Sequence, residues 1–288
     1  MTTTREYLEA DGLGGFASAT HGGMRQRRYH GVLLASTRPP TERFLLVAAL
    51  DVEWRNGRER AALSTHEFEP GVLHPDGVRR MEAFTDDPWP QWTFRLPDGT
   101  TLTQELFVVR GAPLTFVRFR GANRGQLVVR PLLAGRDLHT LHHENSAIDL
   151  GAEPAPGGVR HTLYPGVPPI RVAANGTYRH APDWYRQFRL RMEIERGFDG
   201  VEDLATPGEW TFDLARGPAV LAFGAEIAST PLPDLSDVTT AFRDAAAAEH
   251  VRRTAIDDPL ARAATAYVVR RDEGDDRRRL PVVHRLGS

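Results

Sequence analysis

Short apolar runs with polar residues at alternate positions fill the chain from about residue 32 to residue 224. Residues 92–96 alternate apolar and polar side chains, the turn Pro97-Asp98-Gly99 follows, and two more such runs occupy residues 101–109 and 114–120. An alternation of period two places the apolar side chains on one face of a strand. The pattern therefore predicts antiparallel sheets joined by short turns.

Two Asn-Gly pairs follow apolar runs, one at Asn56-Gly57 after residues 44–54 and one at Asn175-Gly176 after residues 170–174. Asn-Gly is favoured in tight hairpin turns because both residues tolerate a positive φ. We therefore expect β-hairpins at both places. Residues 188–194 alternate four apolar with three charged side chains, which predicts another half-buried strand.

The pattern changes near residue 233, where Pro231 and Pro233 close the β region. Asp234-Leu-Ser236 offers an N-cap for an alanine-rich helix that runs through Arg253. A second helix is predicted after Asp258, because Pro259 suits the first helical position. We expect a β domain over residues 1–232, linker helices over 233–272 and a separate tail over 273–288.

Composition removes several kinds of chemistry. The 288 residues, of which 41% are hydrophobic, include no cysteine, and all 36 basic residues are arginine. This excludes disulfides, thiolate metal sites, cysteine nucleophiles, Schiff-base lysines and the lysine of a phosphate-binding loop. A net charge of −2 offers no broad basic face, so we expect no nucleic-acid partner. No stretch approaches the ~20 apolar residues of a membrane helix and no leader is seen, so we expect no membrane contact and a cytoplasmic location.

Two motifs near the N-terminus are candidates for binding. DGLGGFASAT (residues 11–20) is glycine-rich like a phosphate loop, but no strand is expected before it and its glycine spacing differs from that of a dinucleotide fingerprint. A turn that needs positive φ is therefore the favoured interpretation. The block Arg27-Arg28-Tyr29-His30 either hydrogen-bonds sugar hydroxyls or forms ion pairs within the fold.

Further candidates lie in the middle of the chain. Asp137, His139, His142 and His143 offer nitrogen and oxygen ligands, but nothing fixes their geometry, and we expect neither a metal nor a cofactor. Residues 89–92 and 183–185 carry large aromatic side chains that either stack on a sugar ring or pack in the core. No serine–histidine–acid order and no carboxylate pair can be defended, so no catalytic residue is assigned.

Several of these segments, taken in order, resemble the N-terminal domain of bacterial and archaeal glycogen debranching enzymes. DGLGGFASAT followed by RRYHGVLLAS is similar to the opening of that domain. Four later segments are similar to the rest, namely RPLLAGRDLHTLHHEN (130–145), YPGVPPIRV (164–172), DWYRQF (183–188) and ERGFDGVEDLATPGEW (195–210). The resemblance covers roughly residues 5–272, and its specificity comes from the shared order.

The resemblance implies an all-β fold, a β-supersandwich of the galactose mutarotase type, followed by C-terminal linker helices. In the family an α/α-barrel catalytic domain follows and hydrolyses α-1,6 branch points with paired carboxylates. We expect this chain to lack that domain, to be inactive alone, and to contact glycogen or another α-glucan, with a separately encoded barrel as a possible partner. A stand-alone glucan-binding or scaffold protein is the alternative, and a mutarotase-like epimerase would need a histidine and a carboxylate facing one pocket.

The resemblance also points to residues for a sugar-contacting surface. They are Arg28, Tyr29, His30, Asp137, Trp184 and Tyr185. The same residues could instead fill the sandwich core or pack against the barrel, and one sequence does not separate these roles.

The tail departs from the family. After residues 258–272, which are similar to a lead-in helix, the family has a segment close to AGYPWFTDWGR, whereas this chain reads EGDDRRRLPVVHRLGS. With suitable codons for residues 279–288, the same bases read one nucleotide later spell GYPWFTDWGR. The absence of lysine indicates GC-rich codons, which favours such a reading. We expect a frameshift near residues 273–275 and a poorly packed tail over 275–288.

Overall fold

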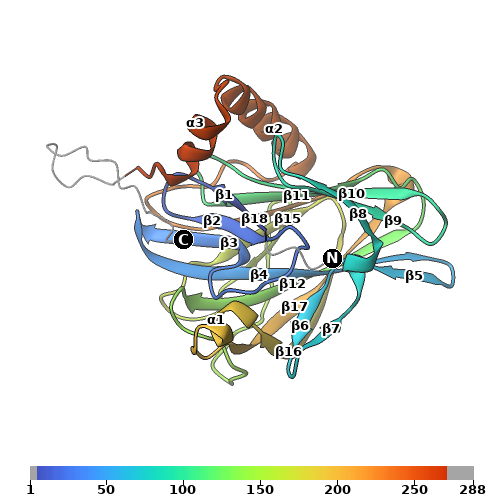
Figure 1. Ribbon diagram of the computed structural model, residues 1–288, viewed down its shortest axis with the longest axis horizontal. Coiled ribbons are helices and arrows are strands. Elements are labelled where there is room, and N and C mark those ends of the chain that lie inside the picture. The colour runs from blue at the N-terminus through green and yellow to red at the C-terminus, as the bar shows by residue number, and fades with distance from the viewer. Residues whose placement is uncertain (1–4, 271–288) are drawn as a thin grey trace, which may run out of the picture.

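Two antiparallel sheets lie face to face, with helices on the outer side of each (Figure 1). The computed structural model describes residues 5–270. Within them, the larger sheet has ten strands in the order β1-β2-β3-β4-β12-β17-β16-β6-β7, with β5 paired to β4. Their bounds are β1 Glu6–Ala10, β2 Phe16–Thr20, β3 Gly31–Arg38, β4 Thr41–Asn56, β5 Glu59–Ala62, β6 His66–Phe68, β7 Val72–His74, β12 Gln126–Asp137, β16 Thr177–Arg189 and β17 Val201–Asp213.

The smaller sheet has eight strands in the order β13-β14-β15-β18-β11-β10-β9-β8. Their bounds are β8 Met81–Thr85, β9 Gln91–Arg95, β10 Thr101–Val108, β11 Leu114–Arg120, β13 Glu153–Ala155, β14 Gly158–His161, β15 Ile170–Ala174 and β18 Ala219–Ala225. The helices are α1 Arg191–Glu195, α2 Val238–Thr254 and α3 Pro259–Ala264, with 3₁₀ turns at Gly77–Arg80 (η1), Leu214–Arg216 (η2) and Thr265–Tyr267 (η3). The predicted all-β supersandwich followed by C-terminal helices is confirmed.

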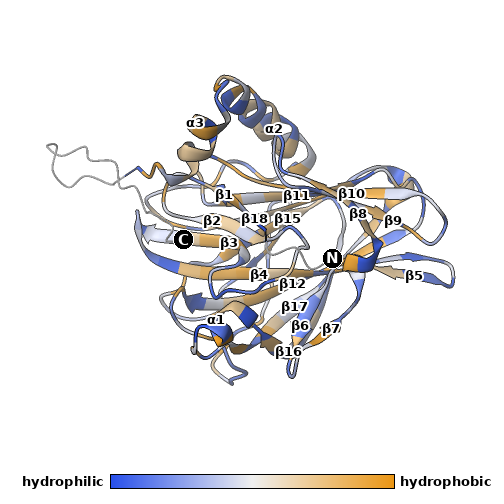
Figure 2. Ribbon diagram, in the orientation of Figure 1, coloured by the Kyte–Doolittle hydropathy of each residue, from blue (hydrophilic) through white to orange (hydrophobic). Residues whose placement is uncertain are grey.

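Apolar side chains form three layers because the central strands are buried on both faces. On β3, Leu33 and Ala35 point between the sheets, whereas Leu34 points to the outer face of the larger sheet. On β12, Leu133 likewise points between the sheets and Leu132 points to the outer face of the larger sheet. Figure 2 shows the apolar residues concentrated on the strands and polar residues on the outer side of α2. Period-two alternation thus gives one core between the sheets and one apolar layer on the outer face of each sheet.

Helix α2 covers the outer face of the smaller sheet. Val238 and Phe242 are buried against Phe107 and Phe116 of that sheet, and Phe242 meets Phe116 edge-on at 5.7 Å between ring centroids. Near the end of the helix, Arg253 donates to the carboxylate of Glu9 on β1 at 2.9 and 2.6 Å. Apolar contact and a buried ion pair therefore attach α2 to the sandwich.

The glycine-rich motif anchors the last helical segment. The side chain of Arg110 donates to the carbonyls of Thr265 and Val268 at 3.0 and 2.7 Å. A Cβ on Gly12 would lie 2.5 Å from Cζ of Arg110, and φ of Gly12 is +76°. Glycine is therefore favoured there by its backbone conformation, and a Cβ would have to displace the guanidinium group of Arg110. We call Gly12, Arg110 and the two carbonyls the helix anchor.

Several local predictions are confirmed. Asn56 pairs with Glu59 across a two-residue turn between β4 and β5, and Gly57 has φ +58°. The turn at Pro97-Asp98-Gly99 joins β9 to β10 as expected. Helix α3 begins at Pro259, and the carboxylate of Asp258 accepts from the N–H of Leu260 at 3.0 Å. The division of the chain near residue 232 stays a prediction.

The prediction of a second hairpin, at Asn175-Gly176, is wrong. β15 pairs with β14 and β18 of the smaller sheet, whereas β16 pairs with β17 of the larger one, so Asn175-Gly176 is a crossing between sheets. The amide of Asn175 accepts from the N–H of Val220 at 2.8 Å and donates to the carbonyl of Pro218 at 2.9 Å. These contacts tie Asn175 to the start of β18 in place of a hairpin turn.

Three further expectations need correction. Residues 191–195 form helix α1 and do not continue the strand, because their Met, Glu and Arg side chains favour a helix. The N-cap of α2 is Asp237, which accepts from Thr239 and Thr240, while Asp234 caps only a turn through Ser236. A strand, β1, does precede the glycine motif, but the chain returns as antiparallel β2, so the motif is a hairpin loop and not a phosphate loop.

Candidate functional site

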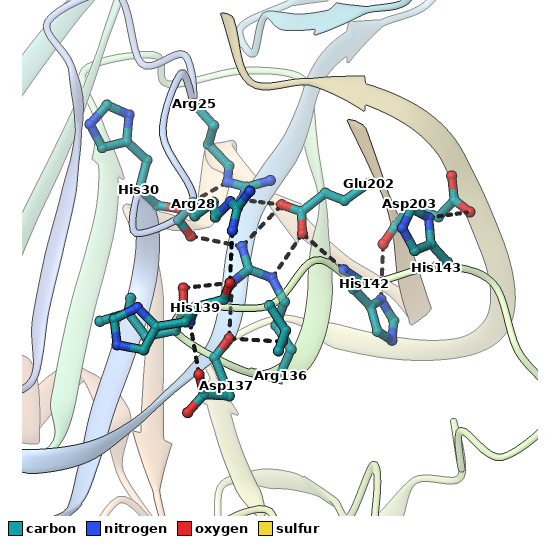
Figure 3. A network of polar contacts seen from close by, with 12 residues as sticks. Arg25, Arg28, His30, Arg136, Asp137, His139, His142, His143, Glu202 and Asp203 are labelled. Atoms are coloured by element: carbon teal, nitrogen blue, oxygen red, sulfur yellow. Dashed lines mark hydrogen bonds and ion pairs between the residues drawn. The ribbon is translucent and has the colours of Figure 1, made fainter. Parts of the chain in front are cut away.

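A buried cluster of three charged side chains joins the β2–β3 loop to β12 and β17 (Figure 3). Glu202, at the start of β17, is fully buried, and its carboxylate accepts from the guanidinium groups of Arg25 and Arg136. Nε of Arg136 lies 2.8 Å from Oε2 of Glu202. We call these residues the Arg–Glu–Arg cluster. Two cations around one carboxylate compensate the buried charge and fix how three distant segments meet.

The charge state of Glu202 follows from its neighbours. Burial raises the pKa of the carboxyl group, but the nearby charges and hydrogen bonds of Arg25 and Arg136 outweigh it and lower the pKa to about 2. The group is therefore ionised at neutral pH. A carboxylate without solvent exposure and without a proton to give has no role as a general acid, so the cluster is structural.

Arg28 and His30, two of the predicted sugar-contacting residues, are bonded within the protein beside this cluster. Arg28 donates to the carbonyls of His139 and Asp199, each at 2.8 Å. His30 is buried, and its Nδ1 accepts from the N–H of Gln26 at 3.0 Å. Of the two readings of the Arg27–His30 block, these contacts favour ion pairs and hydrogen bonds within the fold.

Tyr29 and Asp137 lie at the margin of the same region. Tyr29 is half-buried against the outer apolar layer and meets the ring of His30 edge-on at 5.8 Å. Asp137, at the end of β12, is exposed, and its Oδ1 accepts from the N–H of His139 at 2.8 Å. Figure 3 shows Arg28, His30 and Asp137 gathered around Arg25, Arg136 and Glu202.

The histidines after β12 do not converge on one point. Nδ1 of His142 lies 2.9 Å from the carbonyl of Asp203, and its Nε2 lies 2.7 Å from the hydroxyl of Tyr164. Both ring nitrogens of His142 are thus engaged by the protein. Over residues 5–270, no group of three or more histidine, aspartate or glutamate side chains is arranged to hold a metal ion.

Trp184 and Tyr185 are neighbours on β16 and point to different surroundings. The hydroxyl of Tyr185 donates to Oδ2 of Asp51 at 3.2 Å, and the ring packs on the outer apolar layer. The indole of Trp184 stacks on the imidazole of His142, with centroids 5.4 Å apart and planes at 25°. Because the N–H of His142 also donates to Glu202 at 3.3 Å, Trp184 adjoins the Arg–Glu–Arg cluster.

The sequence match decides the family. The model of the glycogen debranching enzyme N-terminal family matches residues 5–221 and so spans most of the sandwich, including every residue of the site. The chain belongs to this family. No curated protein matches it in sequence.

Two solved structures show the range of similar folds. A bacterial glucoamylase complexed with acarbose shares 10% identity with a TM-score of 0.47, over 92% of this chain and 39% of the glucoamylase. A family GH92 inverting mannosidase from Bacteroides thetaiotaomicron shares 11% identity with a TM-score of 0.32, over 90% of this chain and 32% of the mannosidase. This debranching-enzyme N-terminal chain therefore spans less than half the length of either protein.

Sequence reasoning missed the residues at the centre of the site. Arg25, Arg136 and Glu202 lie inside quoted family segments or beside them, but were not singled out. The available signal was a charged residue on the same face of an apolar strand as a buried leucine, as at Glu202 before Leu204. Such a residue needs a partner, and its partner Arg25 lies 177 positions away in the sequence.

Two hollows of this debranching-enzyme domain are relevant to the epimerase alternative. One is a cavity of about 60 Å³ between the sheets, lined by Tyr7, Arg25 and Trp92 among others. The other is a groove of about 410 Å³ beside Arg171, Glu226 and Asp234. Neither of these two hollows is lined by both a histidine and a carboxylate, so neither supports that alternative.

In the described part of the chain, none of the helices has the length and apolarity needed to cross a membrane.

Proposed function

We propose that this chain is the structural, glucan-contacting N-terminal domain of an α-1,6-glucosidase of glycogen breakdown. The observation that carries the proposal is the family match over residues 5–221. The fold supports it, because the internal contacts of the site attach segments to one another and leave Trp184 half-buried outside the apolar clusters.

The chemistry of the buried acids supports a domain that does not itself cut the bond. Glycosidases use two carboxyl groups separated by about 5 to 10 Å, of which the general acid must carry a proton and reach the glycosidic oxygen. Glu202 is ionised and enclosed by two arginines. Burial raises the pKa of Asp11 to about 7, but its Oδ1 accepts from the N–H groups of Leu13 and Gly15 inside the hairpin loop, where 1% of the residue is exposed.

We further propose that the paired carboxylates belong to an α/α-barrel encoded in the shifted frame or separately. The shifted reading that restores GYPWFTDWGR supports the first source, and the residues concerned, 279–288, lie outside those that the structure describes. The nucleotide sequence tests this: bases that do not spell the motif in the shifted frame, or a lack of barrel coding after it, would refute the shifted-frame source.

A limit-dextrin assay tests whether hydrolysis belongs to the barrel and not to this chain. The purified chain is expected to release no glucose above a buffer control, because we assign the paired carboxylates to the barrel. Release of glucose that depends on the chain would refute the proposal that this domain is inactive alone. Glycogen binding by the chain alone is expected both of a glucan-contacting domain and of a stand-alone binding protein, so barrel coding in the nucleotide sequence separates these two.

A further inference from the structure

Trp184 differs from the other four tryptophans, all of which lie in the described part of the chain. The others are 0 to 7% exposed and belong to apolar core clusters; they are Trp54, Trp89, Trp92 and Trp210. Trp184 is half-buried and is not part of any of the three apolar clusters or the side chains packed on them. Its position is therefore not explained by the packing of the sandwich core.

A fixed imidazole supports one face of this indole. The carbonyl of Asp203 only accepts, so Nδ1 of His142 carries the hydrogen in this contact of 2.9 Å. Nε2 then accepts from the hydroxyl of Tyr164 at 2.7 Å, and the same hydroxyl oxygen accepts from Nδ2 of Asn145 at 2.9 Å. Burial lowers the pKa of His142, in keeping with a neutral ring. The chain of hydrogen bonds holds the ring under Trp184 in one orientation.

Exposed planar polar side chains lie near Trp184 on β16 and on the loop that carries His142. Arg186 pairs with Glu144, and their side chains are 54% and 42% exposed. A bulge in β16 places Gln187 at φ +64°, where its N–H donates to Oδ1 of Asp203 at 2.8 Å. The other oxygen of Asp203 accepts from the N–H of Glu144 at 3.0 Å. Asp203 thus holds the strand bulge and the loop of residues 138–149 beside each other.

We propose that Trp184, with Asn145, Glu144 and Arg186 at its rim, is the surface on which this domain binds an α-glucan chain. This inference rests on the proposed function and names its contact site. A pyranose ring has a C–H face that stacks on an indole and a rim of hydroxyls that both donate and accept. The amide, carboxylate and guanidinium groups match pairs of such hydroxyls. Asp183, Glu144 and Asp203 nearby disfavour a phosphate backbone, so the surface selects a neutral ligand.

Calorimetric titration with maltoheptaose tests the proposal. Trp184→Ala is expected to weaken binding on the order of tenfold or more, because removal of the indole removes the stacking face. Arg186→Ala, an exposed change that leaves the indole in place, is expected to weaken binding severalfold. Phe198→Ala is the matched control, since Phe198 is 59% exposed but its ring lies against the guanidinium group of Arg28, outside the surface. It is expected to bind like the wild type.

The outcomes separate this inference from the proposed function. Wild-type binding that is unchanged in folded Trp184→Ala and Arg186→Ala would overturn the contact site and leave the domain assignment standing. No wild-type binding to maltoheptaose would refute glucan contact itself. If the melting curve shows that Trp184→Ala does not fold, Arg186→Ala becomes the deciding variant. Wild-type affinity of Arg186→Ala for maltoheptaose would then overturn the proposed contact site. Preferential binding of single-stranded DNA would also overturn it.

Discussion

At the residue scale, the Arg–Glu–Arg cluster shows which site features the sequence reveals. The block Arg27–His30 was visible as a dense run of polar residues, and two of its members, Arg28 and His30, lie beside the cluster. Glu202 and Arg136 were not singled out, since a single charge in a strand does not show which distant residue pairs with it. Their importance comes from pairing across β12, β17 and the β2–β3 loop, which only the folded chain brings together.

The cluster predicts a large loss of stability in Glu202→Gln. Removal of the carboxylate leaves two buried guanidinium groups without a counter-charge, which costs about 3 to 5 kcal/mol. Urea unfolding followed by tryptophan fluorescence measures the change. The control is Glu82→Gln, whose partner Arg95 is exposed, and its midpoint should stay near that of the wild type. Equal midpoints for the two variants would contradict a structural role for Glu202.

The stability difference between the wild type and Glu202→Gln should also depend on pH. The folded pKa of Glu202, about 2, lies below its ordinary value of 4.5, so its contribution to stability is present above pH 4.5 and declines as pH falls toward 2. The free-energy difference between wild type and Glu202→Gln should therefore be constant from pH 8 to 5 and shrink below 4.5. A difference that shrinks already between pH 8 and 6 would assign the effect to another group.

At the element scale, the two Asn-Gly dipeptides form different structures. Asn56-Gly57 forms a hairpin because both flanking strands belong to one sheet, whereas Asn175-Gly176 joins strands of opposite sheets. Local turn preference does not specify which strands pair, because pairing depends on contacts distant in sequence. The continuous strands and the cap of α3 were predictable because their signals are local.

The helix anchor predicts how the linker segment is held. Arg110→Ala removes both donors to the carbonyls of Thr265 and Val268, so amide exchange over residues 259–268 should rise about tenfold or more. Hydrogen exchange with mass spectrometry measures it, with Arg95→Ala as the exposed control. Gly12→Ala should also raise amide exchange over these residues, because its new Cβ displaces the guanidinium group of Arg110. Unchanged exchange in both variants would show that the anchor does not hold the helix.

At the scale of the whole molecule, different elements lie on the two outer faces of the sandwich. Helix α2 covers the smaller sheet, as Figure 1 shows, while α1 and the Arg–Glu–Arg cluster lie at the larger sheet. The two-sheet architecture was predictable from alternation and from the order of family segments. Which candidate residues share one surface was not, because this depends on the bulge in β16 and the loop after β12.

Electrophoresis of the purified chain through native gels that contain glycogen tests the central claim most directly. A domain that contacts α-glucans should migrate more slowly as the glycogen concentration rises, and should be unaffected by dextran, whose linkages differ. The mobility of serum albumin corrects for the viscosity of each gel. A chain that migrates equally with and without glycogen after this correction would contradict the account.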